Sequence, residues 1–138
     1  MPRYDLYGQE HVDRYRATDG EEGHEWRPGV YTLLLTTKGR KSGEERTTPL
    51  IYVEHDGGYA VIASKGGAPE HPAWYLNLEE DGEVGVQIAG ETFRARARDV
   101  TGEERDGLWR EMAEIWPDYD EYAKKTDRDI PVVVLDRI

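Results

Sequence analysis

The chain has 138 residues, of which 37% are hydrophobic and 34% charged, and this length suits one domain with its own hydrophobic core. The net charge of −11 argues against nucleic acids and anionic membrane surfaces as partners, because both would repel the chain. The absence of cysteine excludes disulfides, thiolate metal sites and cysteine nucleophiles. No apolar run reaches the roughly 18 residues of a membrane span, and no apolar signal segment follows the first residues. We therefore expect a cytoplasmic protein.

The first 29 residues are mostly polar and contain one predicted helix, residues 9–18, with Val12 and Tyr15 on its apolar face. The strand signals are short β-branched or aliphatic segments bounded by turns, at residues 30–37, 46–53, 59–64, 83–89, 92–99 and 131–135. Glycine-containing turns join neighbouring strands and predict antiparallel hairpins. We expect the last strand at a sheet edge, because Pro131 has no N–H group to donate.

Three more helices are predicted among and after these strands. The first runs over residues 72–78, with Pro72 in its first turn. The second opens at Thr101, where Thr101 and Glu104 resemble a capping box, and a third, shorter helix follows Pro117. The apolar face of the second helix comprises Leu108, Met112 and Ile115, with Trp109 and Trp116. Because the strands form hairpins and do not alternate with helices, the pattern predicts an α+β antiparallel barrel with peripheral helices.

The turn at residues 38–46 carries four basic and two acidic residues in a chain that is otherwise acidic. The basic residues are Lys38, Arg40, Lys41 and Arg46, and they alternate with Gly39 and Gly43. Free backbone N–H groups beside cationic side chains suit a phosphate or a carboxylate. The turn is not a Walker A loop, since Arg40 stands where that motif needs a glycine before Lys41. The alternative is a solvated hairpin tip.

A second candidate site is Ala63-Ser64-Lys65-Gly66-Gly67, where a predicted strand runs into glycines that let the backbone approach a flat ligand. The alternative is a loop whose glycines only serve its turn geometry. Trp74 could form the wall of a pocket beside this loop. Leu76 and Leu78, on the same predicted helix, are assigned to core packing.

The sequence gives weak support for catalysis by side chains alone. The four histidines, His11, His24, His55 and His71, lack metal-ligand spacing, so no metal site is expected. Neither Ser42 nor Ser64 lies in the Gly-x-Ser-x-Gly motif of α/β-hydrolases. The acidic runs at 79–83 and 118–129 are typical of solvated faces. An enzyme with this sequence would therefore rely on a bound cofactor.

Two central blocks of the sequence are specific in combination. The first is Leu33-Leu34-Leu35-Thr36-Thr37-x-Gly39-Arg40-Lys41-Ser42-Gly43-x-x-Arg46-x-x-Pro49-Leu50. The second joins Ala63-Ser64-Lys65-Gly66-Gly67 to Pro72-x-Trp74-Tyr75-x-Asn77-Leu78. The C-terminal third adds Trp116-Pro117-x-Tyr119-x-x-Tyr122 and Thr126-Asp127-Arg128-x-Ile130-Pro131-Val132-Val133. Together these stretches resemble the deazaflavin-dependent nitroreductase family, which occurs mainly in actinobacteria and uses coenzyme F420.

The resemblance implies a split β-barrel that binds F420 over residues 30–138, preceded by a helical or irregular segment at 1–29. It assigns the phosphate and polyglutamate tail of the cofactor to Gly39, Arg40, Lys41 and Arg46. It assigns the deazaflavin ring to Ala63, Ser64, Lys65, Gly66 and Gly67, with Ala73 and Trp74 at the border of the ring.

The resemblance also implies direct hydride transfer from the reduced deazaflavin to an electron-poor acceptor: a quinone, a nitroaromatic compound, or an unsaturated lactone or enone. Tyr119 and Tyr122 would close over the acceptor, and Tyr119, Tyr122, Ser64 or solvent would supply the proton that the product needs. The chain departs from some members at Trp116, where they have tyrosine, and at Ile51, where one branch has an aromatic residue. Residues 19–26 are candidates for covering the pocket.

Three alternatives stay open. They are an FMN-dependent oxidoreductase on the same type of barrel, a non-catalytic deazaflavin carrier, and a small-molecule-binding or stress protein without a redox role. The basic turn by itself does not separate a polyglutamate tail from the single phosphate of FMN. The expected partner is a small-molecule substrate, and a homodimer is left open.

Overall fold

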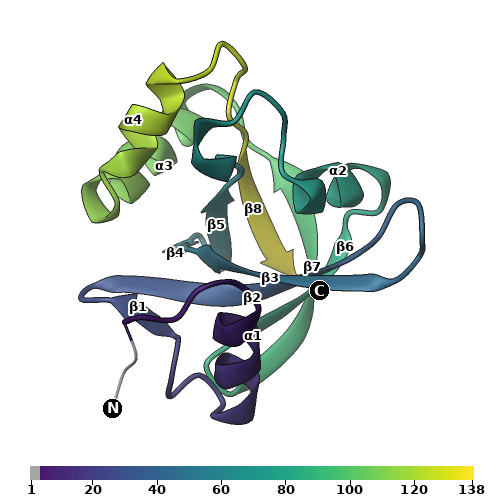
Figure 1. The fold of residues 1–138 in the computed structure, drawn as a ribbon. Helices are drawn as coiled ribbons and strands as arrows, with labels where there is room; N and C mark the ends of the chain where they lie inside the picture. The colour runs from purple at the N-terminus through teal and green to yellow at the C-terminus, as the bar shows by residue number, and fades with distance from the viewer. Residues whose placement is uncertain (1–3) are drawn as a thin grey trace.

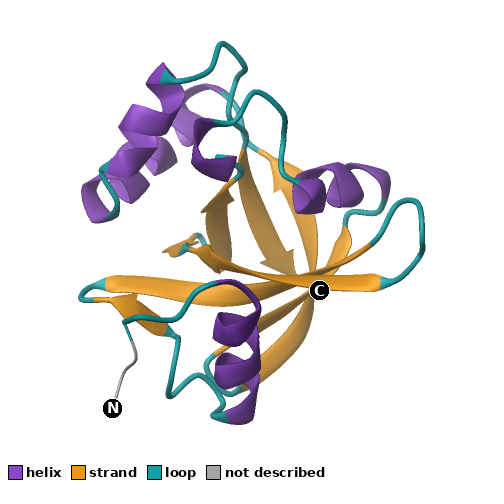
Figure 2. Cartoon of the chain, viewed as in Figure 1, coloured by secondary structure: helices purple, strands orange, loops and turns teal. Residues whose placement is uncertain are grey.

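The computed structural model describes residues 4–138, which form a strongly curled antiparallel sheet with helices packed around it (Figure 1). The helices are α1 (Gly8–Ala17), α2 (Ala73–Glu80), α3 (Gly102–Ile115) and α4 (Asp118–Lys124), with a 3₁₀ turn, η1 (Lys65–Gly67). The strands are β1 (Glu25–Arg27), β2 (Val30–Lys38), β3 (Glu45–Ile51), β4 (Val53–His55), β5 (Gly58–Ile62), β6 (Glu83–Ile88), β7 (Glu91–Asp99) and β8 (Val132–Arg137). The predicted α+β split barrel is confirmed (Figure 2).

The strand order in the sheet is β1-β2-β6-β7-β8-β5-β4, and β3 pairs with β2. The basic turn joins β2 to β3 in a hairpin that runs from the Thr32–Ile51 pair to the Lys38–Glu45 pair. The single strand predicted at 46–53 is interrupted at Tyr52, which separates β3 from β4. The interruption lets β3 stay paired with β2 while β4 pairs with β5, so the chain passes from one part of the sheet to another.

Two hydrophobic clusters lie on opposite faces of β5 and β8. One contains alternate residues of these strands, such as Val61 and Val133, and packs against Trp74 of α2. The other contains the intervening residues, such as Ile62 and Val132, under α3 and α4. Each buried aliphatic side chain contributes on the order of 1.5–3 kcal/mol. β5 and β8 therefore pack against α2 on one face and against α3 and α4 on the other.

The prediction that the last strand lies at an edge is wrong. β8 lies between β7 and β5 and pairs with both. Pro131 precedes the strand, so its missing N–H group interrupts no ladder, and its carbonyl accepts a hydrogen bond from Ala63 N at 2.9 Å. The unbroken apolar run 132–135 is the signal of a strand buried on both faces.

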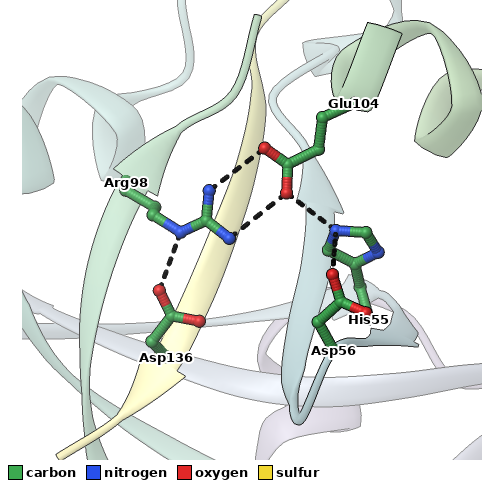
Figure 3. Close-up of polar contacts among 5 residues, drawn as sticks. All are labelled: His55, Asp56, Arg98, Glu104 and Asp136. Atoms are coloured by element: carbon green, nitrogen blue, oxygen red, sulfur yellow. Dashed lines mark hydrogen bonds and ion pairs between the residues drawn. The ribbon is translucent and has the colours of Figure 1, made fainter.

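The predicted capping box at the start of α3 is also wrong. Thr101 is the N-cap residue, but its side chain caps no N–H group. The Glu104 carboxylate instead accepts hydrogen bonds from Arg98 on β7, and its Oε2 lies 2.8 Å from His55 Nε2 on β4 (Figure 3). Arg98 also pairs with Asp136 of β8 at 2.8 Å. A tertiary ion-pair network thus replaces the local cap and fastens α3 to the sheet.

The N-terminal helix α1 docks on the sheet through Val12 and Tyr15, the two residues predicted to form its apolar face. The buried Tyr15 hydroxyl donates to the carbonyl of Thr32 and accepts from Ala89 N, both at 2.9 Å. One side chain thereby joins α1 to β2 and to the turn between β6 and β7.

Tyr15→Phe should lower the free energy of unfolding by about 1–3 kcal/mol, because it removes the hydrogen bonds to the buried Thr32 carbonyl and to the partly buried Ala89 N–H group. Urea unfolding followed by tryptophan fluorescence measures this change. Tyr31→Phe is the matched control, since Tyr31 is 41% exposed and should unfold within about 0.5 kcal/mol of the wild type. Equal unfolding free energies for the two variants would contradict this view of how α1 is attached.

Candidate functional site

A cavity of about 390 Å³ lies where η1 and α2 face α4 and the N-terminal segment. Its floor is apolar and includes Leu50, Ile51 and Ile62. Six residues singled out from the sequence line it: Ser64, Lys65, Gly66, Trp74, Tyr119 and Tyr122. We call it the apolar cavity.

A second cavity, of about 610 Å³, lies beside the hairpin turn between β2 and β3. The residues from the sequence analysis that line it are Gly39, Arg40, Lys41, Arg46, Ala73 and Trp74. We call it the basic cavity. Thr48 and Trp74 line both cavities, so the apolar cavity and the basic cavity are neighbours. Lys38, counted with the basic turn, lines neither.

Asn77 fixes the position of Arg40 in the basic cavity. This buried side chain on α2 accepts hydrogen bonds from Arg40 N at 3.2 Å and Arg40 Nη1 at 3.0 Å. Its amide nitrogen donates to Thr37 Oγ1 at 3.1 Å. The sequence analysis gave Asn77 no role, because its partners lie in a distant hairpin. These hydrogen bonds anchor the exposed glycine-rich turn to α2 at Arg40.

The loop from Ser64 to Gly67 has an unusual backbone. Lys65, Gly66 and Gly67 have φ values of 48°, 62° and 83°, three successive residues in the left-handed region. Within residues 4–138, the N–H groups of Ser64 and Lys65 donate to no other group, and both residues line the apolar cavity. The loop therefore has two backbone donors available beside that cavity.

Two of the residues predicted to contact the ring lie outside both cavities. Ala63 and Gly67 are buried and line neither cavity. A Cβ atom on Gly67 would lie 2.6 Å from the carbonyl oxygen of Tyr122, so glycine is needed here for the close approach of α4 to the loop. The structure gives Gly67 a packing role.

The tyrosines of α4 face the opposite side of the apolar cavity. Tyr119 and Tyr122 pack edge to face, with ring centroids 6.1 Å apart. Burial raises the pKa of the Tyr119 hydroxyl, so this group stays protonated and can donate a hydrogen bond. It has no hydrogen-bond partner among the described residues; the residue as a whole is 4% exposed, and the hydroxyl oxygen is not among the buried atoms that lack a partner. A ligand oxygen in the cavity would satisfy it.

The N-terminal segment completes the cavity with His11 and Trp26. The two rings stack with centroids 6.3 Å apart, and Trp26 also contacts Trp116, at 5.3 Å. Burial lowers the pKa of His11, whose Nε2 lies 3.0 Å from the carbonyl of Gly23 and donates to it. Sequence analysis missed His11. The sequence feature that indicates His11 is a polar residue next to Val12, on the apolar face of the predicted helix.

One group of potential metal ligands occurs among residues 4–138: His55, Asp56 and Glu104. Arg98 donates to both carboxylate oxygens of Glu104, so the group belongs to the ion-pair network that fastens α3 (Figure 3). It lines neither the apolar nor the basic cavity.

Comparison with known proteins identifies the family. Residues 7–137 match the model of the family described as F420H(2)-dependent quinone reductase. The chain belongs to this family. It is an F420H(2)-dependent reductase, and its cofactor is coenzyme F420.

An F420H(2)-dependent quinone reductase of Mycobacterium tuberculosis is 38% identical over 126 residues, covering 89% of this chain and 85% of the relative. A solved F420-H2 dependent reductase, FDR-A, is 45% identical with a TM-score of 0.70, covering 76% of this chain and 93% of the other. A solved structure described as a domain-swapped dimer is 41% identical with a TM-score of 0.72, covering 93% and 96%. Among the described residues of this chain, no helix is long and apolar enough to cross a bilayer.

The close packing at Gly67 leads to a stability prediction. Gly66→Ala should lower the free energy of unfolding by about 1–2 kcal/mol, because alanine is strained in the left-handed region. No steric clash adds to this cost, since the new Cβ atom would meet nothing within 4 Å. Gly67→Ala should cost a further 1–3 kcal/mol or so, because the new Cβ atom must also displace the backbone of α4. Chemical unfolding of both variants measures the difference. Equal destabilisation would show that α4 does not press on the loop.

Proposed function

We propose that the chain transfers a hydride from reduced F420 to an electron-poor organic acceptor in the apolar cavity: a quinone, a nitroaromatic compound, or an unsaturated lactone or enone. The observation that carries the proposal is that the apolar and basic cavities adjoin each other at Thr48 and Trp74. A flat ring joined to an anionic tail needs these two environments side by side. The residues present therefore fit the cofactor of the family.

The basic cavity would hold the phosphate and the polyglutamate tail. Arg40, Lys41 and Arg46 supply positive charge there, and Asn77 holds Arg40 in place before any ligand binds. Charge-assisted hydrogen bonds to phosphate or carboxylate are worth about 1.5–3 kcal/mol each. Such preorganisation reduces the entropy lost when a long anion binds.

The apolar cavity would hold the deazaflavin ring, which supplies the hydride when bound. The free N–H groups of Ser64 and Lys65 would donate to its polar edge, and Trp74 would border it. Aromatic side chains line the acceptor side and would limit the access of water once both ligands are bound, which would favour direct transfer over competing reactions. The protonated Tyr119 hydroxyl would donate to the acceptor, with Tyr122 and Ser64 as the other candidate donors.

The space on the acceptor side favours an enzyme over a carrier. The apolar cavity extends from the Ser64 loop to Trp26 and His11, so more than a ring-binding slot is present. A carrier needs no such space. The cytoplasmic location expected from the sequence stays a prediction, and the homodimer stays an open possibility.

The deciding experiment is a fluorescence titration of the protein with oxidised F420 and, in parallel, with FMN. We expect tighter binding of F420, because the basic cavity can pair with several anionic groups of its tail. Lys41→Ala and Arg46→Ala should each weaken F420 binding by roughly 10- to 150-fold, as loss of one charge-assisted contact implies. Added salt should also weaken binding of the wild type.

Arg96→Ala is the control for charge, since Arg96 is an exposed residue of β7 that lines neither cavity. It should bind F420 as the wild type does. Equal or tighter binding of FMN by the wild type would reject the proposed function in favour of the FMN-dependent alternative.

A second prediction concerns acceptor choice. Tyr119→Ala and Tyr122→Ala should change the relative rates with a quinone, a nitroaromatic compound and an enone, because both side chains line the apolar cavity. The affinity for F420 should stay near that of the wild type, since the basic cavity contains neither residue. Steady-state rates with the three acceptors, together with F420 titrations, measure the two effects.

Tyr59→Ala separates packing from pocket shape. Tyr59 is a half-buried tyrosine of β5 that contacts Phe93 and lines neither cavity. It should lower the melting temperature without changing the ratio of rates. If Tyr119→Ala and Tyr122→Ala behave in the same way, the two tyrosines only stabilise the barrel.

A further inference from the structure

Arg128 makes a set of contacts that neither the fold nor the proposed chemistry explains. It lies between α4 and β8, and its guanidinium group reaches one distant loop, residues 63–71. Its Nε donates to the carbonyl of Ala68 at 2.8 Å, and its Nη2 to that of Ser64 at 2.6 Å. Its Nη1 donates to the carbonyl of Ala63 at 3.2 Å and to His71 Nδ1 at 3.0 Å. All three guanidinium nitrogens are used.

The acceptors of Arg128 are all uncharged. No carboxylate within residues 4–138 forms an ion pair with it, and desolvation lowers its pKa while the group stays charged. Glu70 lies close enough for its charge to act on Arg128, but the direct partners of the guanidinium group are three backbone carbonyls and an imidazole. The contribution of Arg128 is geometric, because its planar guanidinium group fixes the positions of several acceptors at once.

The bound carbonyls belong to the peptide units that carry the free donors of the apolar cavity. The Ala63 carbonyl shares a peptide unit with the Ser64 N–H group, and the Ser64 carbonyl shares one with the Lys65 N–H group. A cation at the carbonyl end polarises the peptide and strengthens its N–H group as a donor. Arg128 therefore orients and strengthens both donors from behind the loop.

The same contacts join the loop to α4. Gly67 packs against the backbone of Tyr122, and Arg128 extends the contact from the segment that follows α4. The wall with backbone donors and the wall with tyrosine side chains are thus fastened to each other at two points.

We propose that Arg128 is a positioning residue, whose guanidinium group holds the loop 63–68 so that the Ser64 and Lys65 N–H groups face the cofactor ring. This rests on the proposed placement of the ring in the apolar cavity. The residue itself lines neither cavity and touches no reacting atom in this arrangement.

The test compares Arg128→Ala and Arg128→Lys with Arg105→Ala. Arg105 donates to the carbonyl of Ile130 at 2.7 Å, so its loss loosens the same segment without touching the loop. In the cofactor-free protein, hydrogen exchange at the amides of Gly67 and Ala68, which bond within the loop, reports how well the loop is held. Fluorescence titration gives the dissociation constant of F420.

We expect Arg128→Ala to raise the dissociation constant of F420 by about tenfold or more and to accelerate exchange at both amides. Millimolar guanidinium chloride should restore much of both properties, whereas sodium chloride and urea at the same concentration should not. Arg128→Lys keeps the charge but loses the planar fork, so it should also bind F420 weakly. Arg105→Ala should match the wild type in both measurements.

Two results would overturn the proposal. One is wild-type exchange and F420 affinity in folded Arg128→Lys or Arg128→Ala. The other is an equal loss in Arg105→Ala with no rescue by guanidinium, which would indicate a general loosening. Failure of the wild type to bind F420 would count against the proposed function alone, since exchange in the cofactor-free variants still reports on the loop.

Discussion

The pairing of β5 with β8 is the constraint on which the site depends. Ile62 pairs with Val132 at one end of these antiparallel strands, and Ala63 N donates to the carbonyl of Pro131 just beyond that pair. Because β5 ends where β8 begins, the loop that leaves β5 and the segment that enters β8 must run side by side. The first carries the Ser64 donors, and the second follows the helix with Tyr119 and Tyr122. Both walls of the apolar cavity are therefore positioned by one strand pair.

Burial of these strands on both faces explains why the helices lie where they do. One face packs against α2, whose Trp74 lines both cavities and whose Asn77 holds Arg40. The other face packs under α3 and α4. The same alternation of apolar side chains that forms the core thus brings the basic turn, the loop and the tyrosines around two neighbouring cavities. The chain has a net charge of −11, so the local cluster of Arg40, Lys41 and Arg46 is what allows an anionic ligand to approach.

Local features of the fold were predictable from the sequence, because they depend on neighbours along the chain. Hairpin turns, the buried strand β2 and the apolar face of α1 follow from short-range patterns. The failures are all long-range. Pro131 suggested an edge strand, because the sequence does not show whether the proline lies inside the hydrogen-bonded ladder or just before it. Glu104 suggested a cap because nothing in the sequence shows that Arg98 and His55 will approach it. The roles of Asn77, His11 and Arg128 were missed for the same reason, since their partners lie in other elements.

In the proposed arrangement the two halves of the site are built by different means, which would separate cofactor binding from acceptor choice. The proposed cofactor half consists of backbone N–H groups, glycines and cations beside the barrel and α2. The proposed acceptor half consists of a wall of aromatic side chains from peripheral segments, among which Trp26 of β1 contacts Trp116 after α3. In this arrangement, a change in the size of Trp26 or Trp116 would alter the acceptor space and leave the hydrogen bonds of Arg40 in place. Trp116 stands where some members of the nitroreductase family have tyrosine, so this wall, and not the basic cavity, is where the acceptor range of this chain would differ from theirs.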